Sequence, residues 1–347
     1  MKKTLAALIV TAFAASTANA AVVYDNEGTK VELNGSLRLI MEKADKKVYN
    51  AANQSTKKAN SALRNAGSRF GITVKHNLDN DFYALGRLEF RFDDTTSRDK
   101  FGRLYAKRAY VGLGSKATGD ITFGRQLTIA DDLSQAVDYE YGFIPKSEYI
   151  PTAGTGVVRY DYKGIEGLQL SANYNFGQTN DEKGNPLKPG IKNAYAVGAL
   201  YTVGDLDARL AYGHTNFETG ASYAHRLDGV LASLGYKFGD FTLTGDFGYG
   251  HEKLDDAKVN KFYVSPGFAY QVVPASKVYG NYLYERAKGE SDKVKTHGFL
   301  LGADYKLHKQ VVLFVEGKYV TAKKYTNDAY DGKVKDRAIG VGMRVFF

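Results

Sequence analysis

The chain has 347 residues and a formal net charge of +9, with 37 glycines, 26 tyrosines and 19 phenylalanines, but only 6 prolines and no cysteine. The lack of cysteine excludes a disulfide framework, and basic and acidic residues are mixed along the chain, which argues against a basic segment that binds nucleic acid. Abundant aromatic residues and glycine with little proline favour a large continuous β-structure.

The first twenty residues, MKKTLAALIVTAFAASTANA, have the three parts of a secretory signal peptide. Two lysines follow the first methionine, residues 5–15 are apolar, and the last three residues form an A-x-A cleavage site. The apolar stretch is shorter than the roughly 20 residues that a membrane-spanning helix requires. We therefore expect residues 1–20 to be removed on export and residues 21–347 to form a single domain.

The remaining chain is a series of segments in which apolar and polar residues alternate. In residues 31–41, for example, Val, Leu and Met fall on one face, and Glu, Asn, Ser and Arg fall on the other. A period of two residues is typical of a β-strand with one apolar and one polar face. Sixteen strands are expected, over residues 29–42, 67–77, 81–93, 102–115, 119–126, 156–163, 167–177, 192–203, 205–214, 225–238, 240–251, 259–272, 276–287, 295–307, 309–322 and 336–347.

The connections between these segments alternate between short turns and long polar stretches. Gly-Asp pairs mark three of the short turns, at residues 119–120, 204–205 and 239–240. Eight long connections are expected, at residues 43–66, 94–101, 127–155, 178–191, 215–224, 252–258, 288–294 and 323–335.

A soluble two-sheet sandwich and a closed membrane barrel both fit the alternation itself. The barrel is favoured because the segments, at about 10–14 residues, are longer than the roughly 5–6 of most strands and suit a tilted membrane crossing. The alternation of short turns with long loops is also typical of outer-membrane barrels. Tyrosines lie near segment ends, as in the aromatic girdles at membrane interfaces, at Tyr160, Tyr162, Tyr174, Tyr201, Tyr212, Tyr236, Tyr249, Tyr270 and Tyr305.

The sequence therefore predicts an all-β fold, a 16-stranded antiparallel transmembrane β-barrel with short periplasmic turns, eight long external loops and a water-filled lumen. Strand parity places charged residues on the lumen face, where water accepts them, with Arg125 as an exception. These lumen residues are Arg38, Arg69, Lys75, Arg87, Glu89, Arg108, Arg159, Asp161, Arg209, Asp246, Glu316, Lys318 and Arg344.

The chain resembles the general diffusion porins of Gram-negative outer membranes, in particular the major porins of the Pasteurellaceae. The resemblance covers essentially all of residues 21–347 and rests on VELNGSLRL, SRFGITVKHNL, YAKRAYVGLGS, GDITFGRQ and the terminal GVGMRVFF. It implies an outer-membrane homotrimer that contacts lipid and lipopolysaccharide and passes small hydrophilic solutes and ions. It also implies that the outer-membrane assembly machinery reads Phe347. No cofactor or metal is expected, and divalent-ion binding by loop acids such as Asp255 and Asp256 stays open.

The resemblance further implies that the third external loop, residues 127–155, folds inward and narrows the channel. In this family, basic wall residues lie opposite acids of that loop. The loop acids match best at Asp138 and Glu140, where YEYGF takes the place of the family's P-E-F-G-G segment. Opposed charges across a narrow water path would admit small polar solutes and disfavour apolar ones. The basic positions match at Arg69 and Arg108, with Arg38 standing in beside Ser36 and with Arg87 and Arg159 as further inward-facing candidates.

Other functions fit the sequence less well. The six histidines are scattered and lie in no nucleophile or metal-binding motif, so an enzyme is not expected. A substrate-specific channel for a sugar or an anion is the alternative. Tyr83 and Tyr110 are candidates for stacking against a sugar in the lumen, and a further surface role of the long loops stays open.

Overall fold

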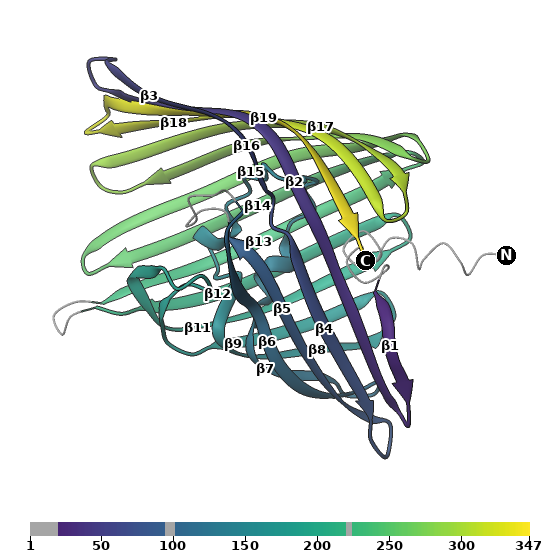
Figure 1. Cartoon of the computed structure of the whole chain (residues 1–347). Helices are drawn as coiled ribbons and strands as arrows, with labels where there is room; N and C mark the ends of the chain where they lie inside the picture. The colour runs from purple at the N-terminus through teal and green to yellow at the C-terminus, as the bar shows by residue number, and fades with distance from the viewer. Residues whose placement is uncertain (1–19, 94–100, 220–223) are drawn as a thin grey trace.

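The structure is a computed structural model that describes residues 20–93, 101–219 and 224–347. These residues form one antiparallel sheet that closes on itself as a barrel (Figure 1). Within this part of the chain, no helix has the length and apolar character needed to cross a membrane. The signal peptide expected over residues 1–20 falls, apart from Ala20, outside the described residues.

The strands follow one another around the barrel in chain order. They are β1 (Ala21–Asn26), β2 (Thr29–Asn50), β3 (Ser55–Asn65), β4 (Arg69–Asn77), β5 (Phe82–Asp93), β6 (Arg103–Ser115), β7 (Gly119–Leu127), β8 (Ala153–Ile165), β9 (Leu168–Asn175), β10 (Gln178–Asn180), β11 (Pro186–Val203), β12 (Leu206–Phe217), β13 (His225–Phe238), β14 (Phe241–Leu254), β15 (Ala257–Val273), β16 (Ser276–Lys288), β17 (Asp292–His308), β18 (Val311–Thr326) and β19 (Ala329–Phe346).

These nineteen strands of the described residues occupy sixteen positions in the wall, which confirms the predicted barrel. Strands β3 and β4 pair one after the other along β2, and β9 and β10 do the same along β11. Strand β1 pairs with the start of β2 directly beyond the end of β19, so the two chain ends share one position. The pairing of β19 with β2 closes the barrel.

Several expected loops are extended hairpins. Residues 43–66 contain the outer half of β2, a turn at residues 51–54 and all of β3. Residues 323–335 contain only a two-residue turn, at which Asn327 and Asp328 have φ angles of 50° and 62°, as in hairpin turns of type I′. The apolar–polar alternation stops where the hydrocarbon ends, whereas the backbone ladder continues beyond it. The predicted strand ends therefore mark the membrane boundary rather than the end of pairing.

The outer surface is apolar and carries the expected tyrosine girdle. Leu37, Met41, Ile339 and Val341 are more than half exposed, with 60%, 62%, 57% and 52% of their surface accessible. Eight of the nine predicted girdle tyrosines are exposed as well, with Tyr162 of intermediate exposure. The inner surface carries the buried charges, since Glu316, Asp246 and Glu89 are at most 3% exposed.

Candidate functional site

The longest described connection, residues 128–152 between β7 and β8, folds into the barrel; we call it loop 3. It contains two short 3-10 helices, η4 (Ile129–Leu133) and η5 (Lys146–Glu148). Its path is fixed by buried carboxylates on the inner wall, which accept hydrogen bonds from backbone N–H groups of the loop.

Glu316 of β18 is the main anchor. The backbone N–H groups of Tyr139, Glu140 and Tyr141 donate to its carboxylate at 2.6, 2.8 and 2.5 Å. The Tyr279 hydroxyl donates to the same carboxylate at 2.8 Å. Glu316 is fully buried, so four donors compensate its desolvation and hold the middle of loop 3 against the wall.

Asp246 of β14 is a second anchor. It accepts the Ser134 hydroxyl at 3.0 Å and the backbone N–H groups of Gln135 and Ala136 at 3.0 and 3.2 Å. Nearby, Arg209 of β12 donates to the carbonyl of Asp132 at 2.7 Å. These bonds fix the first half of loop 3.

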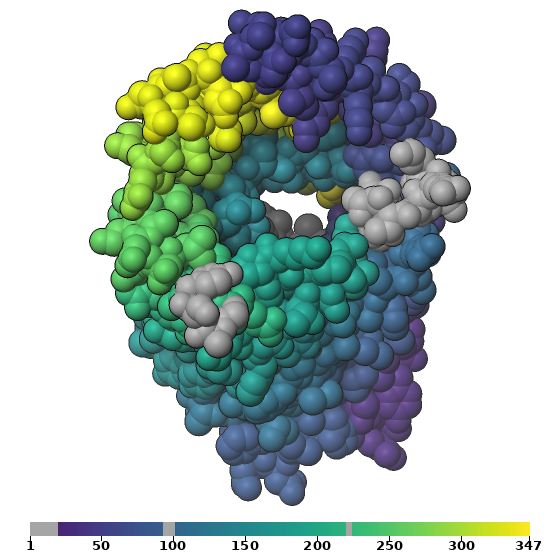
Figure 2. All heavy atoms as spheres, turned by 90° about the vertical axis from the view of Figure 1, so that its left-hand side faces the viewer, coloured from purple at the N-terminus to yellow at the C-terminus, as the bar shows by residue number. Residues whose placement is uncertain are grey.

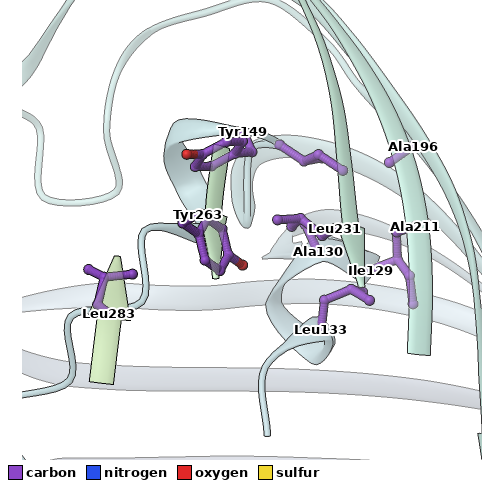
Figure 3. Close-up of a cluster of buried hydrophobic side chains, with 10 residues drawn as sticks. Ile129, Ala130, Leu133, Tyr149, Ala196, Ala211, Leu231, Tyr263 and Leu283 are labelled. Atoms are coloured by element: carbon purple, nitrogen blue, oxygen red, sulfur yellow. The ribbon is translucent and has the colours of Figure 1, made fainter. Parts of the chain in front are cut away.

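Apolar packing covers the rest of the contact between loop 3 and the wall. Figure 3 shows Leu133 of η4 and Tyr149, which directly follows η5, against wall residues that include Leu231 and Tyr263. Two wall glycines make room for the loop, because an added Cβ would lie 2.2 Å from the Tyr149 carbonyl oxygen at Gly229 and 2.6 Å from the Ile150 side chain at Gly213. A second cluster places Val137, Tyr139, Tyr141 and Phe143 against Ile40, Ala66, Tyr279, Leu300, Phe314 and Ala338.

The wall from β19 and β2 through β4, β5 and β6 carries a cluster of arginines that we call the arginine wall. In the described part of the chain, none of the anchoring contacts above involves β4, β5 or β6, the strands that carry most of the cluster. Figure 2 looks into the barrel from the side of the external hairpins and shows an opening that passes through the molecule. The arginine wall consists of Arg38, Arg69, Arg87, Arg91, Arg108 and Arg344.

Strand register brings these arginines together. Arg69 lies opposite Arg91 between β4 and β5, and Arg38 lies opposite Arg344 between β2 and β19. Arg108 of β6 lies opposite Glu89 of β5, and a bulge between these two strands follows this pair. Five strands, β2, β4, β5, β6 and β19, thus bring their inward arginines together in the lumen.

Glu89 is the carboxylate that pairs with this wall. Its oxygens lie 2.8 Å from Arg87, 2.6 Å from Arg91 and 3.5 Å from Arg108. The Nε–H groups of Arg38 and Arg69 donate instead to neutral oxygens, the Ser36 hydroxyl at 2.7 Å and the Gly67 carbonyl at 3.2 Å. Arg344 also donates to a neutral oxygen, the carbonyl of Tyr139.

The structure brings four of the five predicted basic residues together and separates the fifth. Arg38, Arg69, Arg87 and Arg108 belong to the arginine wall. Arg159 lies apart from it, where it pairs with Asp161 at 2.9 Å and with Asp132 of loop 3 at 2.8 Å. Arg159 is an anchor of the loop in this structure.

The two predicted loop acids differ in their surroundings. Glu140 forms an ion pair with Arg64 at 2.6 Å, and Arg64 also pairs with Glu42 at 2.8 Å. Asp138 keeps contact with water. The protein atoms that surround it inside the barrel, and next the negative charge of Glu316, raise the pKa of Asp138 to about 6.

Sequence reasoning omitted three arginines from the site. Arg91 and Arg344 share the lumen parity of their neighbours, so strand register was the missing information. Arg64 fell in the segment 43–66, which was expected to be a loop. Within the described residues, no group of three His, Asp or Glu side chains is arranged to hold a metal ion.

Phe347 is held by backbone pairing with Gly35 of β2. Its N–H donates to the Gly35 carbonyl at 3.1 Å, and its carbonyl accepts the Gly35 N–H at 2.8 Å. An added Cβ at Gly35 would lie 2.4 Å from the Phe347 ring, so the glycine leaves space for the terminal ring. Phe346 lies within 6.0 Å of the Arg38 guanidinium.

Comparison with known proteins agrees with an outer-membrane β-barrel. The chain matches a family model described as Gram-negative porin over residues 4–325. It is 30% identical over 377 aligned residues to the major outer membrane protein of Pasteurella multocida strain Pm70, and the match covers 100% of both chains.

Solved structures of similar fold include OmpT of Vibrio cholerae in its trimer form, with a TM-score of 0.69 and 19% identity over 92% of this chain and 100% of that one. The anion-selective porin from Comamonas acidovorans has a TM-score of 0.66 and 18% identity, again over 92% and 100% of the two chains. These two likenesses show the fold, whereas the family model and the full-length relative show the family. The chain therefore belongs to the Gram-negative porin family and forms an outer-membrane channel for passive diffusion of small hydrophilic solutes.

Proposed function

We propose that the constriction of this channel lies between the arginine wall and loop 3, and that it favours anions over cations. The observation that carries the proposal is the charge balance: six arginines line the wall and Glu89 is the carboxylate paired with them. Fixed positive charge along a narrow water path raises the local concentration of anions and lowers their barrier to passage.

Loop 3 offsets this charge only in part. Of its acids, Glu140 is paired with Arg64 and Asp132 with Arg159, so these two carboxylates already have cationic partners. Asp138 remains in contact with water. A transverse field between Asp138 and the arginine wall would order water and admit polar solutes, whereas an apolar solute would have to displace this water without replacing its interactions with the charges.

A sugar-specific channel receives less support. Tyr83, a candidate for stacking, donates its hydroxyl to Asp120, and the Lys75 ammonium lies 3.6 Å from the centre of its ring. One face of the ring is therefore occupied. We also propose that the protein has no enzymatic activity, because passive diffusion needs no catalytic group.

Planar-bilayer recording of the purified protein tests the ion preference. Stepwise insertion of large ohmic channels is expected, with a zero-current potential in a salt gradient whose sign corresponds to anion flow. A cation-selective potential at neutral pH would overturn the proposal. The absence of conductance steps from correctly folded protein would contradict the channel itself.

We also propose that the protein is a homotrimer whose subunits meet over β2, β4–β7 and β19. Apart from Tyr24 of β1, the exposed tyrosines of the described residues lie on β8, β9, β11–β15, β17 and β18, whereas β2, β4–β7 and β19 expose aliphatic residues and phenylalanine but no tyrosine. Tyrosine concentrates where a barrel meets the lipid interface. A stretch of wall in which Tyr24 of β1 is the one exposed tyrosine among the described residues supports contact with neighbouring subunits rather than with lipid.

A further inference from the structure

The hairpin formed by the outer half of β2 and by β3 is strongly basic. Residues 43–63 contain five lysines and one acid, Asp45. Figure 1 shows this hairpin at the end of the barrel where the other external hairpins lie, beside β19. We call residues 43–63 the basic hairpin. Its lysines are Lys43, Lys46, Lys47, Lys57 and Lys58.

Lysines occupy both faces of the basic hairpin. Met41 and Leu63 lie opposite each other on the apolar outer surface, where they are 62% and 54% exposed. Lys47 and Lys57 are opposed in the same way, each six residues nearer the tip, an even number of steps that keeps them on the outer face. The lysines on the other face are Lys46 and Lys58, which also oppose each other.

The positive charge of the basic hairpin has few partners within the protein. Like charges that lie opposite each other on a sheet destabilise the pairing. Asp45 is shared between two cations, since its carboxylate lies 2.6 Å from Arg337 and 3.5 Å from Lys57. In the part of the chain that the structure describes, no ion pair involves the other four lysines of the hairpin. An anion from outside the chain would relieve this repulsion. The opposed basic pairs are Lys46–Lys58, Lys47–Lys57 and Lys47–Lys335, the last between β2 and β19.

Lys47 and Lys57 lie beyond the lipid headgroups. Met41 and Leu63 are the last large aliphatic residues on the outer face before the tip of the hairpin. Six residues of strand span about 20 Å, which corresponds to about 15 Å along the membrane normal for strands tilted by about 40°. The headgroup layer outside the hydrocarbon is only about 5–8 Å thick. A ligand of the basic hairpin is therefore a molecule in the external solution rather than a membrane lipid.

The other side chains of the basic hairpin favour a polysaccharide over a nucleic acid. Single-stranded nucleic acid binds through bases that stack on aromatic rings. Tyr49 is the one aromatic residue of the hairpin, and the ammonium groups of Lys333 and Lys335 already lie 4.7 and 5.8 Å from the centre of its ring. Exposed amides, by contrast, donate and accept hydrogen bonds as sugar hydroxyls require. These amides are Asn50, Asn53, Gln54 and Asn60.

We propose that the basic hairpin binds a soluble anionic polysaccharide, a sugar chain with sulfate or carboxylate groups. The lysines supply the opposite charge, and the amides bind the hydroxyl groups of the sugars. On the outer face, Lys57, Lys47 and Lys335 follow one another across three adjacent strands, over about 10 Å, so that one linear chain can contact all three. The site lies outside the pore and is independent of its ion preference.

The test compares variants of the full-length protein in detergent. A matched control removes the same charge as the site variant, but from exposed lysines of other external hairpins. A double variant, Lys47→Gln with Lys58→Gln, retains part of the charge of the basic hairpin. The site variant combines Lys46→Gln, Lys47→Gln, Lys57→Gln and Lys58→Gln. The matched control combines Lys188→Gln, Lys192→Gln, Lys258→Gln and Lys288→Gln.

The probe is a fluorescein-labelled heparin decasaccharide, and its fluorescence anisotropy measures binding at physiological salt. Three unlabelled competitors identify the chemistry that the hairpin recognises. Oligogalacturonate carries carboxylates without sulfate, dextran is a neutral sugar chain, and single-stranded DNA of the same total charge is an anion of another class.

The parent and the matched control should bind heparin with affinities within about threefold of each other, because salt screens exposed charges that lie more than about 10 Å from the ligand. The site variant should lose roughly 30-fold in affinity, and the double variant roughly fivefold. Dextran should not compete. Displacement of heparin by oligogalacturonate would show that carboxylates suffice, whereas its failure to compete would assign the site to sulfated chains.

Equal affinity of the parent and the site variant for heparin would overturn the proposal, as would an equal loss in the matched control. Competition by single-stranded DNA as strong as that by unlabelled heparin would show binding to charge alone and would also overturn it. Unchanged single-channel conductance and thermal unfolding would show that the site variant is correctly folded.

Discussion

Glu89 lies directly opposite Arg108 across the ladder between β5 and β6, and their side chains approach to 3.5 Å. The same carboxylate also pairs with Arg87 and Arg91 on its own strand. One acid thus lowers the repulsion within a group of arginines that lie side by side on one wall of the lumen. This arrangement links ion selectivity to stability.

Replacement of Glu89 by Gln should change both properties. The loss of its charge leaves the arginine wall more positive, so the preference for anions should increase. The buried guanidinium groups lose their partner, which should lower the free energy of unfolding by about 3 kcal/mol. Zero-current potentials and thermal unfolding in detergent measure the two effects. A variant with higher anion preference and unchanged stability would contradict the structural half of this prediction.

Substitution of Arg69 and Arg108 by Ala should have the opposite effect on selectivity. Each change removes a positive charge from the arginine wall, so the zero-current potential in a salt gradient should shift toward cations. Arg337→Ala is the control, because Arg337 pairs with Asp45 on the outer surface with half of its side chain exposed. If both wall variants kept the selectivity and conductance of the parent channel, Arg69 and Arg108 would not belong to the constriction.

Glu316→Ala should loosen loop 3. The substitution removes the acceptor of three backbone N–H groups and of the Tyr279 hydroxyl, so the loop is expected to leave the wall and fluctuate. The recording should show increased current noise with frequent partial closures. Glu316→Gln retains one acceptor oxygen and should show a smaller change. Quiet channels from Glu316→Ala would mean that the apolar clusters alone hold the loop.

Acidification should strengthen the anion preference through Asp138. Its pKa is raised to about 6, so its carboxylate is charged at neutral pH and becomes neutral as the pH falls through that value. The charged groups around it are Glu316 and Glu140, together with Arg344 and Lys146. Loss of the Asp138 charge leaves less negative charge near the arginine wall. The zero-current potential should therefore shift in the direction of higher anion selectivity.

The Asp138→Asn variant provides the control for this pH dependence. It should have the low-pH selectivity at every pH from about 5 to 7, where the other carboxylates of ordinary pKa remain charged. A parent channel with selectivity constant over this range would contradict the assignment. If the selectivity of the Asp138→Asn variant changed with pH by the same amount as that of the parent, the titration would belong to another group.

The trimer contact can be tested with cysteine, since the chain contains none. Val111 of β6 lies on the proposed subunit face and Val197 of β11 on the lipid face, and both are more than half exposed in the single chain. A thiol at Val197→Cys should react with a lipid-soluble maleimide in the native trimer, whereas one at Val111→Cys should be protected until the trimer dissociates. Equal labelling of both thiols before dissociation would exclude this face as the contact.

Parity along each strand predicted which side chains face the lumen, because a period of two leaves only two choices. It therefore placed Arg38, Arg69, Arg87 and Arg108 on the correct face. Parity does not give height, which depends on the register between strands and on the bulge that follows Glu89. For this reason the sequence did not show that Arg91 and Arg344 belong to the same cluster, or that Arg159 lies outside it.

The path of loop 3 depends on contacts between residues far apart in the chain. Glu316 and Asp246 were predicted to face the lumen, but nothing near them in sequence indicates that their partners are backbone N–H groups of residues 134–141. The outer half of β2 was missed for a different reason. Its residues, such as Lys46 and Lys47, lie beyond the apolar layer and lack the alternation by which the other strands were recognised.

The pairing of Phe347 with Gly35 also sets the order in which the barrel can form. Most neighbouring strands pair with the next strand along the chain and can form as local hairpins, whereas β19 and β2 join opposite ends of the chain. Such a contact carries the largest loop-closure entropy of the fold and is expected to form last. Until then two unpaired strand edges remain, and these cannot be left exposed in lipid. Barrel closure is therefore a step that awaits the complete chain, and the final residue takes part in it directly.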